Sequence, residues 1–327
     1  MKKVLISLFA VAAMVSCAND ELVELNQEAI SFENAFVDNA TRTIDPSITT
    51  GTISTFKVYG NTQGDGTGEQ IVKIFENVPV NKDGANWAYD AGYNQYWIAG
   101  NTYNFAALVN AERCFLDASF LPKTVGFTVT DGATDLLYAR TETPIVGLAS
   151  GNQKVAFTFN HLLSKVQFTF KNTMITNANG NIYTYRISNI SINGAHKTGK
   201  CTLATPEWKD YNGTVDLAFG NITNDDVNGT AVKVGVVGAA DSATSQYALL
   251  LIPAAYDDLN ITCIIETLYN GSVVDTQAYN QDVDVTLAPG NAYNFVISKG
   301  APGEQIQFTV TEVNEWATPT GGPDVNL

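Results

Sequence analysis

The stretch GNTYNF at residues 100–105 returns as GNAYNF at residues 290–295, with one difference in six positions. In both copies a Gly-Asn pair, which tolerates a positive φ, comes before a run in which aromatic and apolar residues alternate with others. The repeat therefore predicts the same turn into the same kind of β-strand at two places in the chain. Two copies in similar local surroundings indicate two β-sandwich domains of similar build.

Elsewhere in the chain, apolar residues recur at every second position, which is the period of a half-buried strand. KVAFTF (154–159), KVQFTF (165–170) and ISTFKVYG (53–60) show this pattern, and clusters of Gly, Asn, Asp and Pro separate such runs. The pattern predicts an all-β sandwich fold. We expect helix only as a turn or two at LDASFLP (116–122).

The length of the chain fits two domains better than one, because its 327 residues exceed what a single sandwich usually needs. The alternation pauses in small and polar residues at VGLASGNQ (146–153). We therefore expect an N-terminal sandwich over residues 17–150 and a C-terminal sandwich over residues 151–327.

The first seventeen residues, MKKVLISLFAVAAMVSC, have the pattern of a bacterial lipoprotein signal. Two lysines precede an apolar run that is too short to span a bilayer, and a small residue precedes Cys17. We expect a signal peptide over residues 1–16, with lipidation of Cys17 tethering the mature protein to a membrane. No second apolar run is long enough to cross a bilayer.

The charge of the chain excludes one class of partner. Without Lys2 and Lys3 the mature chain has 16 basic and 33 acidic residues, a net charge near −17. Because such a surface repels phosphate backbones, we expect no binding to nucleic acid. His161 and His196 have no catalytic or metal-binding partner at a recognisable spacing, so we expect no metal, no cofactor and no enzymatic activity.

The cysteines leave one structural question open. Once Cys17 is lipidated, Cys114, Cys201 and Cys263 remain, an odd number without metal-binding spacing. An exported protein can form disulfides, so a Cys201–Cys263 bridge stays open beside the alternative of buried thiols within strands.

Taken in order along the chain, these segments resemble the fimbrillin family of Bacteroidota lipoproteins, which includes the type V pilins and Mfa-like fimbrial lipoproteins. No single segment carries the resemblance; it rests on their order and spacing from Met1 to about Trp316. The segments are MVSC (14–17), AISFENAF (29–36), ATR (40–42), FKVYG (56–60), YWIAGNTYNFAAL (96–108), VAFTFNHLLSKVQFTF (155–170), LAPGNAYNFVI (287–297) and VNEW (313–316).

The resemblance implies two transthyretin-like (Greek-key) sandwiches in tandem and a role as a fimbrial subunit, or as an accessory or tip pilin. Such lipoproteins reach the outer membrane, where a protease cuts after a basic residue that follows the first strand. Here that residue is Arg42. The strand that would leave is Ile30 to Phe36, with Ile30, Phe32, Asn34 and Phe36 facing inward, or with a register shifted by one residue at a bulge.

Loss of the first strand would open an apolar groove with unpaired backbone groups, into which a strand of another pilin subunit could insert. The last residues, ATPTGGPDVNL (317–327), form a poor strand because of their prolines and glycines. A donor strand could instead be QIQFTVTEV (305–313), in which Ile306, Phe308 and Val310 alternate. A subunit without a donor would sit at a tip or serve as an anchor, and the adhesion ligand stays open.

Two other classes of function remain. In NWAYDAGYNQYW (86–97), Trp87 and Trp97 could form a stacking platform of a surface-anchored glycan-binding lipoprotein, or they could belong to a hairpin with one aromatic face in the core. A hydrolase would need a carboxylate pair that the sequence alone does not single out.

Overall fold

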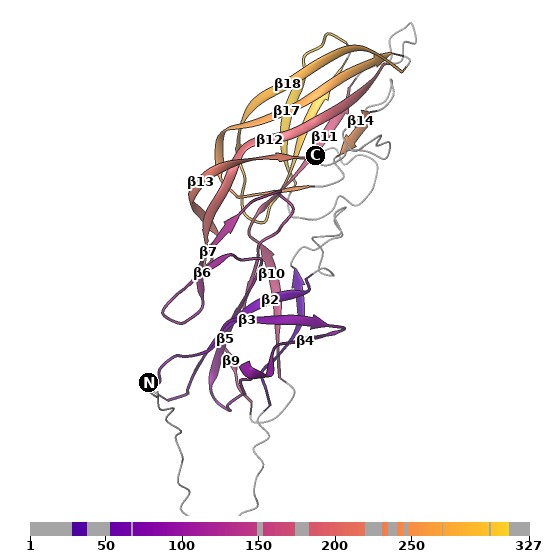
Figure 1. Ribbon diagram of the computed structural model, residues 1–327. Helices are drawn as coiled ribbons and strands as arrows, with labels where there is room; N and C mark the ends of the chain where they lie inside the picture. The colour runs from indigo at the N-terminus through magenta and orange to yellow at the C-terminus, as the bar shows by residue number, and fades with distance from the viewer. Residues whose placement is uncertain are drawn as a thin grey trace, which may run out of the picture.

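The computed structural model describes residues 28–37, 53–66, 68–148, 153–173, 183–219, 231–234, 241–244, 248–269, 271–300 and 302–313. These residues form an elongated molecule built almost entirely from β-strands (Figure 1). Helix is limited, within the described residues, to one short 3-10 turn, η2 (Ala91–Tyr93). The all-β sandwich expected from the alternating pattern is confirmed.

One end of the molecule is formed by an eight-stranded sheet with the order β2-β3-β4-β1-β10-β8-β5-β9. β2 also pairs with β5, so the chain of pairings from β2 through β3, β4, β1, β10, β8 and β5 closes into a ring. Closing a sheet in this way leaves its member strands without a free edge. The strands are β1 (Ser31–Val37), β2 (Thr55–Gln63), β3 (Val72–Asp83), β4 (Asn86–Ala88), β5 (Thr102–Val109), β8 (Leu137–Arg140), β9 (Ile145–Val146) and β10 (Lys154–His161).

The other end is formed by two sheets that face each other. A five-stranded sheet holds β11 (Ser164–Asn172), β15 (Asp241–Thr244), β16 (Leu249–Leu251), β19 (Ala292–Lys299) and β20 (Gln307–Val313). A seven-stranded sheet holds β6 (Arg113–Leu116), β7 (Pro122–Thr128), β12 (Tyr183–Thr202), β13 (Glu207–Ala218), β14 (Ala231–Val234), β17 (Ala255–Tyr269) and β18 (Ser272–Thr286).

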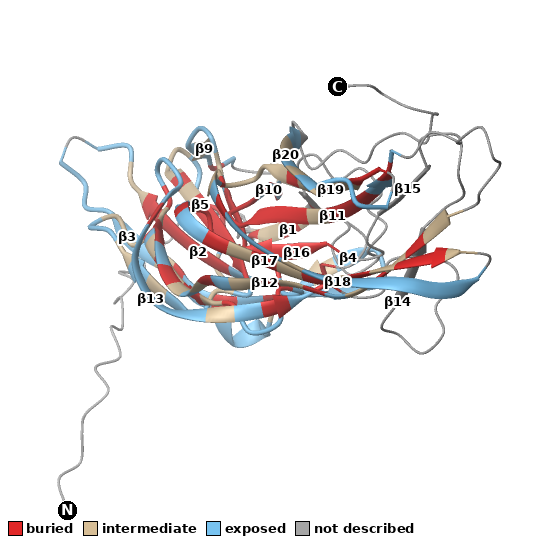
Figure 2. Ribbon diagram, turned by 90° about the horizontal axis from the view of Figure 1, so that it is seen from above, coloured by how far each residue is buried: buried red, intermediate tan, exposed pale blue. Residues whose placement is uncertain are grey.

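Each end has its own buried apolar core, and Figure 2 shows the buried segments gathered on the inner sides of the sheets. β10 illustrates how the period of two builds such a core. Val155, Phe157 and Phe159 are at most 1% exposed, whereas the residues between them face outward. Burying one large apolar side chain contributes about 1.5–3 kcal/mol, so these alternating faces supply much of the driving force for folding.

The sheets do not divide the chain at one point. β6 and β7 precede residue 150 but pair within the seven-stranded sheet, whereas β10 follows residue 150 and belongs to the ring. The division into residues 17–150 and 151–327 therefore stays a prediction.

The two copies of the repeated hexapeptide form the same corner. Gly100 and Gly290 have φ values of 84° and 72°, and β5 and β19 begin two residues later. In each copy the tyrosine hydroxyl accepts a hydrogen bond from the backbone N–H five residues earlier. Tyr103 accepts from Ile98 and Tyr293 from Ala288, both at 2.8 Å. The predicted turn into a strand is therefore present at both places.

The helical turn expected at residues 116–122 was wrong. Asp117 caps a tight turn there, because its Oδ1 accepts hydrogen bonds from the backbone N–H groups of Ser119 and Leu121. Phe120 adopts a φ of 63°, which ends any right-handed helix at that point. The turn joins β6 to β7 as a hairpin.

The cysteines in the described part of the chain are free thiols. Cys201 is fully buried and Cys263 is 3% exposed. Their register partners on the neighbouring strands are Trp208 for Cys201 and Tyr279 for Cys263, and the two thiols form no disulfide with each other. The alternative of buried thiols therefore describes both of them.

Candidate functional site: the first strand and its groove

β1 is one link in the closed ring of the eight-stranded sheet. It runs parallel to β10, with register pairs from Ser31↔Lys154 to Val37↔Phe159. On its other side it pairs with β4 at a single position, Phe32↔Trp87. β1 therefore closes the ring with strong pairing on one side and weak pairing on the other.

Backbone hydrogen bonds hold the start of β1 in its track. The Ile30 N–H donates to the Gln95 carbonyl at 2.7 Å, and the Trp97 N–H donates to the Glu28 carbonyl at 3.1 Å. The Tyr89 hydroxyl donates to the Ile30 carbonyl at 2.5 Å. Residues 89–97 thus form the wall of the groove where β1 begins.

Phe32 lies at the centre of the aromatic core inside the ring. Its side chain is 4% exposed, and the neighbouring Ile30 is 1% exposed. Most of the aromatic contacts of Phe32 are edge-on, a favoured geometry for such pairs, and one is stacked. The rings around it, at centroid distances of 5.8 to 6.1 Å, are those of Phe56, Phe75, Tyr89, Phe105 and Phe157.

A bulge changes the inward face of β1 in its second half. The register with β10 shifts between Glu33 and Ala35, so one residue is left over on the β1 side. Ala35 is 8% exposed and packs into the same core as Phe32. Of the two registers that the sequence left open, the structure has the one with the bulge. Phe36 pairs with Thr158 through its backbone, and its side chain lies outside the described part.

Without β1 the ring would be open between β4 and β10. The backbone groups of β10 that pair with β1 would lose their partners along six register positions. The pockets filled by Ile30 and Phe32 would also open, each worth about 1.5–3 kcal/mol of apolar burial. An extended strand with matching apolar side chains is the ligand that such a groove fits.

β20, which holds the candidate donor residues Phe308 and Val310 and follows directly on Ile306, occupies a different position. It pairs with β19 and, among the described strands, with no other, so one edge is unpaired. Ile306, Phe308 and Val310 are partly buried and pack against the core of their own end. The Phe308 ring contacts Phe295 edge-on at 5.7 Å.

The aromatic segment at residues 86–97 faces mostly inward. Trp97 is 4% exposed, its ring contacts Tyr103 at 4.7 Å, and its Nε1 donates to the Gln153 carbonyl. Trp87 is half-buried and packs against Phe56 at 5.0 Å. Because the faces of Trp97 are covered, a glycan platform would rest on Trp87 alone. The segment is not a simple hairpin either, since β4 is followed by the 3-10 turn η2.

Sequence reasoning placed Trp87 and Trp97 in this segment but missed Tyr89 and Gln95, which bind the backbone of β1 directly. The spacing of Trp87 and Tyr89 by two residues was the available signal for a shared inward face. Nothing local marks Gln95, because its contribution is a carbonyl group. Cys17 and Arg42 lie outside the described residues.

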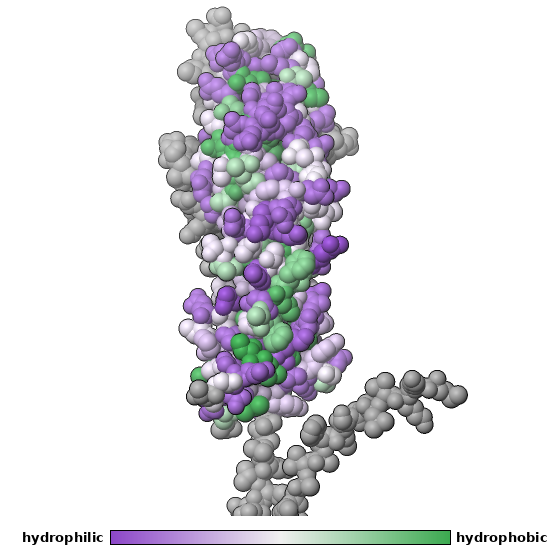
Figure 3. Space-filling model, turned by 90° about the vertical axis from the view of Figure 1, so that its left-hand side faces the viewer, coloured by the Kyte–Doolittle hydropathy of each residue, from purple (hydrophilic) through white to green (hydrophobic). Residues whose placement is uncertain are grey.

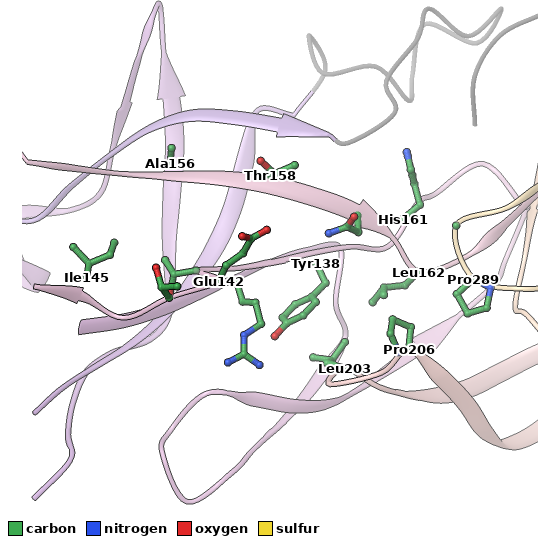
Figure 4. A pocket seen from close by; sticks show the side chains of 15 residues that line it. Tyr138, Glu142, Ile145, Ala156, Thr158, His161, Leu162, Leu203, Pro206 and Pro289 are labelled. Carbon is green, nitrogen blue, oxygen red and sulfur yellow. The ribbon is translucent and has the colours of Figure 1, made fainter. Parts of the chain in front are cut away.

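A hollow of about 860 Å³ lies on the outer face of β10, opposite the face that points into the core of the ring. Ala156 and Thr158 line it from β10, and Glu142 approaches from the segment after β8 (Figure 4). His161, at the end of β10, is buried and hydrogen-bonds to Asp135. Among the described residues no three His, Cys, Asp or Glu side chains are grouped to hold a metal ion.

None of the helices in the described part of the chain has the length and apolar character needed to cross a membrane. No curated protein matches the sequence. A solved structure shows the same fold. A fimbrial protein from Bacteroides vulgatus superposes with a TM-score of 0.60 at 14% identity, covering 88% of this chain and 99% of its own.

Two further structures are described as putative cell adhesion proteins. The one from Bacteroides ovatus has 14% identity and a TM-score of 0.48, covering 89% of this chain and 99% of its own. The one from Bacteroides uniformis has 18% identity and a TM-score of 0.41, covering 87% and 98%. A family profile described as fimbrillin-like matches residues 41–316, which is most of the sequence. The chain therefore belongs to the fimbrillin-like family.

Proposed function

We propose that this protein is a subunit of a cell-surface fimbrium and that it assembles by exchange of β1 for a strand of another subunit. Membership of the fimbrillin-like family supports the role of a structural adhesion protein, not an enzyme. The fold shared with a fimbrial protein of Bacteroides vulgatus is consistent with it. In this proposal Cys17 carries the lipid that holds the precursor at the outer membrane, and cleavage after Arg42 frees β1.

The observation that carries the proposal is the place of β1 in the ring. A strand that fills the centre of a core is normally held by its own chain, yet β1 is followed closely by a basic residue, Arg42. After a cut there, only noncovalent contacts would retain the strand. Its weak pairing with β4, at Phe32↔Trp87 alone, gives a replacement strand a side from which to displace it.

β20 is the donor that fits this groove by its side chains. Ile306 and Phe308 have the same order and spacing as Ile30, which immediately precedes β1, and Phe32 of β1, and both Ile30 and Phe32 are buried. If β20 enters parallel to β10, as β1 does, isoleucine replaces isoleucine and phenylalanine replaces phenylalanine. Val310 would then approach the position beyond Phe32, where β1 has its bulge.

The first test is cleavage with an arginine-specific protease, followed by mass spectrometry and size analysis. We expect a cut after Arg42, release of the β1 fragment and growth of ladders with increasing protein concentration. Arg42→Lys keeps the charge but should resist the enzyme and stay monomeric. A synthetic peptide of residues 302–313 should bind the cut protein and block the ladder, and the same peptide with Phe308→Ser should not. A cut protein that has lost its β1 fragment and remains monomeric would contradict the proposal.

A further inference from the structure

A group of apolar side chains is exposed at the end of the molecule that holds β5 and β9. Figure 3 shows hydrophobic atoms gathered toward this lower end, in the half that Figure 1 assigns to β2–β5 and β9. We call this group the mouth patch. Its members are Tyr93, Tyr96, Ile98, Val146 and Leu148, which are 49%, 44%, 49%, 52% and 55% exposed.

Two segments bring the mouth patch together. The Gly100 N–H donates to the Gly147 carbonyl and the Gly147 N–H donates to the Asn101 carbonyl, at 3.1 and 2.8 Å. These bonds place Val146 and Leu148, on either side of Gly147, beside the corner that begins at Ile98. In both segments the residue in the middle is buried, so its neighbours point outward on one side.

The mouth patch borders, at Tyr96, the point where the track of β1 begins. Ala29 forms a β-bridge with Tyr96, between the Gln95 carbonyl that accepts from Ile30 and the Trp97 N–H that donates to the Glu28 carbonyl. Any strand that occupies the β1 track in the same direction must enter past Tyr96. The exposed apolar surface is thus continuous with the groove.

The direction of the donor strand decides what lies over the mouth patch. With Ile306 at the position of Ile30, the residues before Ile306 lead out of the groove at its mouth. Six residues lie between Lys299, the last residue of β19, and Ile306, and the seven steps of the chain span at most about 25 Å. The body of the donating subunit is therefore held close to the mouth patch.

The donating subunit also carries exposed apolar residues near this connection. Val273 and Val274, at the start of β18, are 45% and 55% exposed. The start of β18 lies near the end of β19. The Tyr185 hydroxyl of β12 donates to the Gly300 carbonyl, just after β19, and β12 pairs there with the end of β17, which turns directly into β18. Opposite ends of the molecule thus carry apolar surface, as a head-to-tail contact between copies requires.

We propose that the mouth patch is a docking surface for the body of a second copy of this chain, the copy whose β20 fills the groove. This inference rests on the proposed strand exchange and adds to it a contact between folded bodies. Strand insertion alone tethers two subunits through a short connection. Contact at the mouth patch fixes their relative orientation and buries apolar side chains that the isolated subunit leaves in water.

The test separates the two contacts by using a double variant, Ile98→Ser with Leu148→Ser, and a control variant, Phe115→Ser. Phe115 is 51% exposed and lies on β6, in the seven-stranded sheet. Each protein is cut after Arg42 and freed of its β1 fragment. Binding of the peptide 302–313 measures the groove alone, and light scattering with electron microscopy measures polymerisation.

We expect the double variant to bind the peptide as the unmodified protein does, but to polymerise at least about tenfold more slowly and into poorly aligned chains. Phe115→Ser should leave both measurements unchanged. Equal polymerisation of the double variant and the unmodified protein would overturn the docking proposal, and so would equal losses in the control. If the unmodified cut protein neither binds the peptide nor polymerises, the strand exchange itself fails, which is a distinguishable result.

Discussion

β1 and β20 are similar in side chains and opposite in surroundings. Each has an isoleucine immediately before the strand and a phenylalanine two residues later, yet Phe32 is 4% exposed inside a closed ring, whereas Phe308 is half-buried on an edge strand. β1 has neighbours on both sides, and β20 pairs with β19 alone among the described strands. The difference teaches that the groove, more than the strand, determines how much stabilisation an Ile-x-Phe pattern provides.

This contrast gives a direction to strand exchange. A β20 strand that leaves its edge loses one row of backbone hydrogen bonds and partial burial of three side chains. In an empty β1 track it would gain pairing with β10 and full burial at the positions of Ile30 and Phe32. In the proposed exchange, β20 would therefore gain stability only after β1 has left, which is what the proposed cleavage after Arg42 would achieve.

The largest expected effect is a difference between Phe32→Ala and Phe308→Ala in the uncut protein. Removing a buried phenylalanine from the centre of a core typically costs about 3–5 kcal/mol, because a cavity remains. Phe308 is only half-buried, so its loss should cost about 1–2 kcal/mol. Urea denaturation monitored by tryptophan fluorescence would measure both losses of stability. Trp87 and Trp97 report on the core of the ring, and Trp208 reports on the other core.

Phe115→Ala is the matched control for this pair, because its ring is exposed and its removal should change stability by less than about 0.5 kcal/mol. If Phe308→Ala destabilised the protein as much as Phe32→Ala, β20 would be as firmly held as β1. The proposed ease of its release would then be wrong.

The contrast itself could be predicted from the sequence only in part. Alternation identified the strand at residues 305–313 and its apolar face, because the period of two depends on local geometry, whereas the strand at residues 29–36 was expected from the resemblance to the fimbrillin family. That β1 closes a ring depends on the pairing of Phe32 with Trp87, 55 positions along the chain, and on β2 with β5. Pairings between distant segments have no local signal, so the depth of the groove was not predictable.

Local rules also failed where a single side chain overrode a propensity. At residues 116–122 the carboxylate of Asp117 binds backbone N–H groups and turns the chain into a hairpin, so the expected helical turn does not form. The prediction of a turn at Gly100 and Gly290 was correct because it depended on a local property of the backbone. Gly100 and Gly290 meet a backbone requirement, a positive φ, that is satisfied within a few residues.

A smaller effect on stability is expected at the two Gly-Asn corners, of which one precedes β5 in the ring and the other precedes β19 beside β20. Tyr103 lies in the ring that holds β1, and Tyr293 lies in β19, where it pairs with Glu312 of β20. Replacing either tyrosine with phenylalanine leaves one backbone N–H, of Ile98 or Ala288, without its partner. Each change should lower the free energy of unfolding by about 1–3 kcal/mol.

The two corner variants should differ in what they release. After cleavage at Arg42, Tyr103→Phe should speed the loss of the β1 fragment, and Tyr293→Phe should leave that rate unchanged. In competition with the peptide 302–313, Tyr293→Phe should polymerise faster, because its own β20 is less firmly held. The rates can be followed by mass spectrometry of the released fragment. An equal acceleration of fragment loss in both variants would mean that the two corners are not mechanically separate.

The smallest expected effect concerns the thiols of the core that holds β20. Burial raises the pKa of Cys201 and of Cys263 to about 12, so at pH 8 both are neutral thiols and poor nucleophiles. Loss of β1 opens the ring but removes no residue from the core around these cysteines. Labelling by iodoacetamide should therefore stay slow before and after the β1 fragment is released, and both thiols should react in urea without a reductant. Cys114 is the internal comparison, because it is only half-buried and its pKa is raised to about 11. Rapid labelling of Cys263 on release of β1 would show that the two cores unfold together, and the contrast between the two strands would then belong to one cooperative unit.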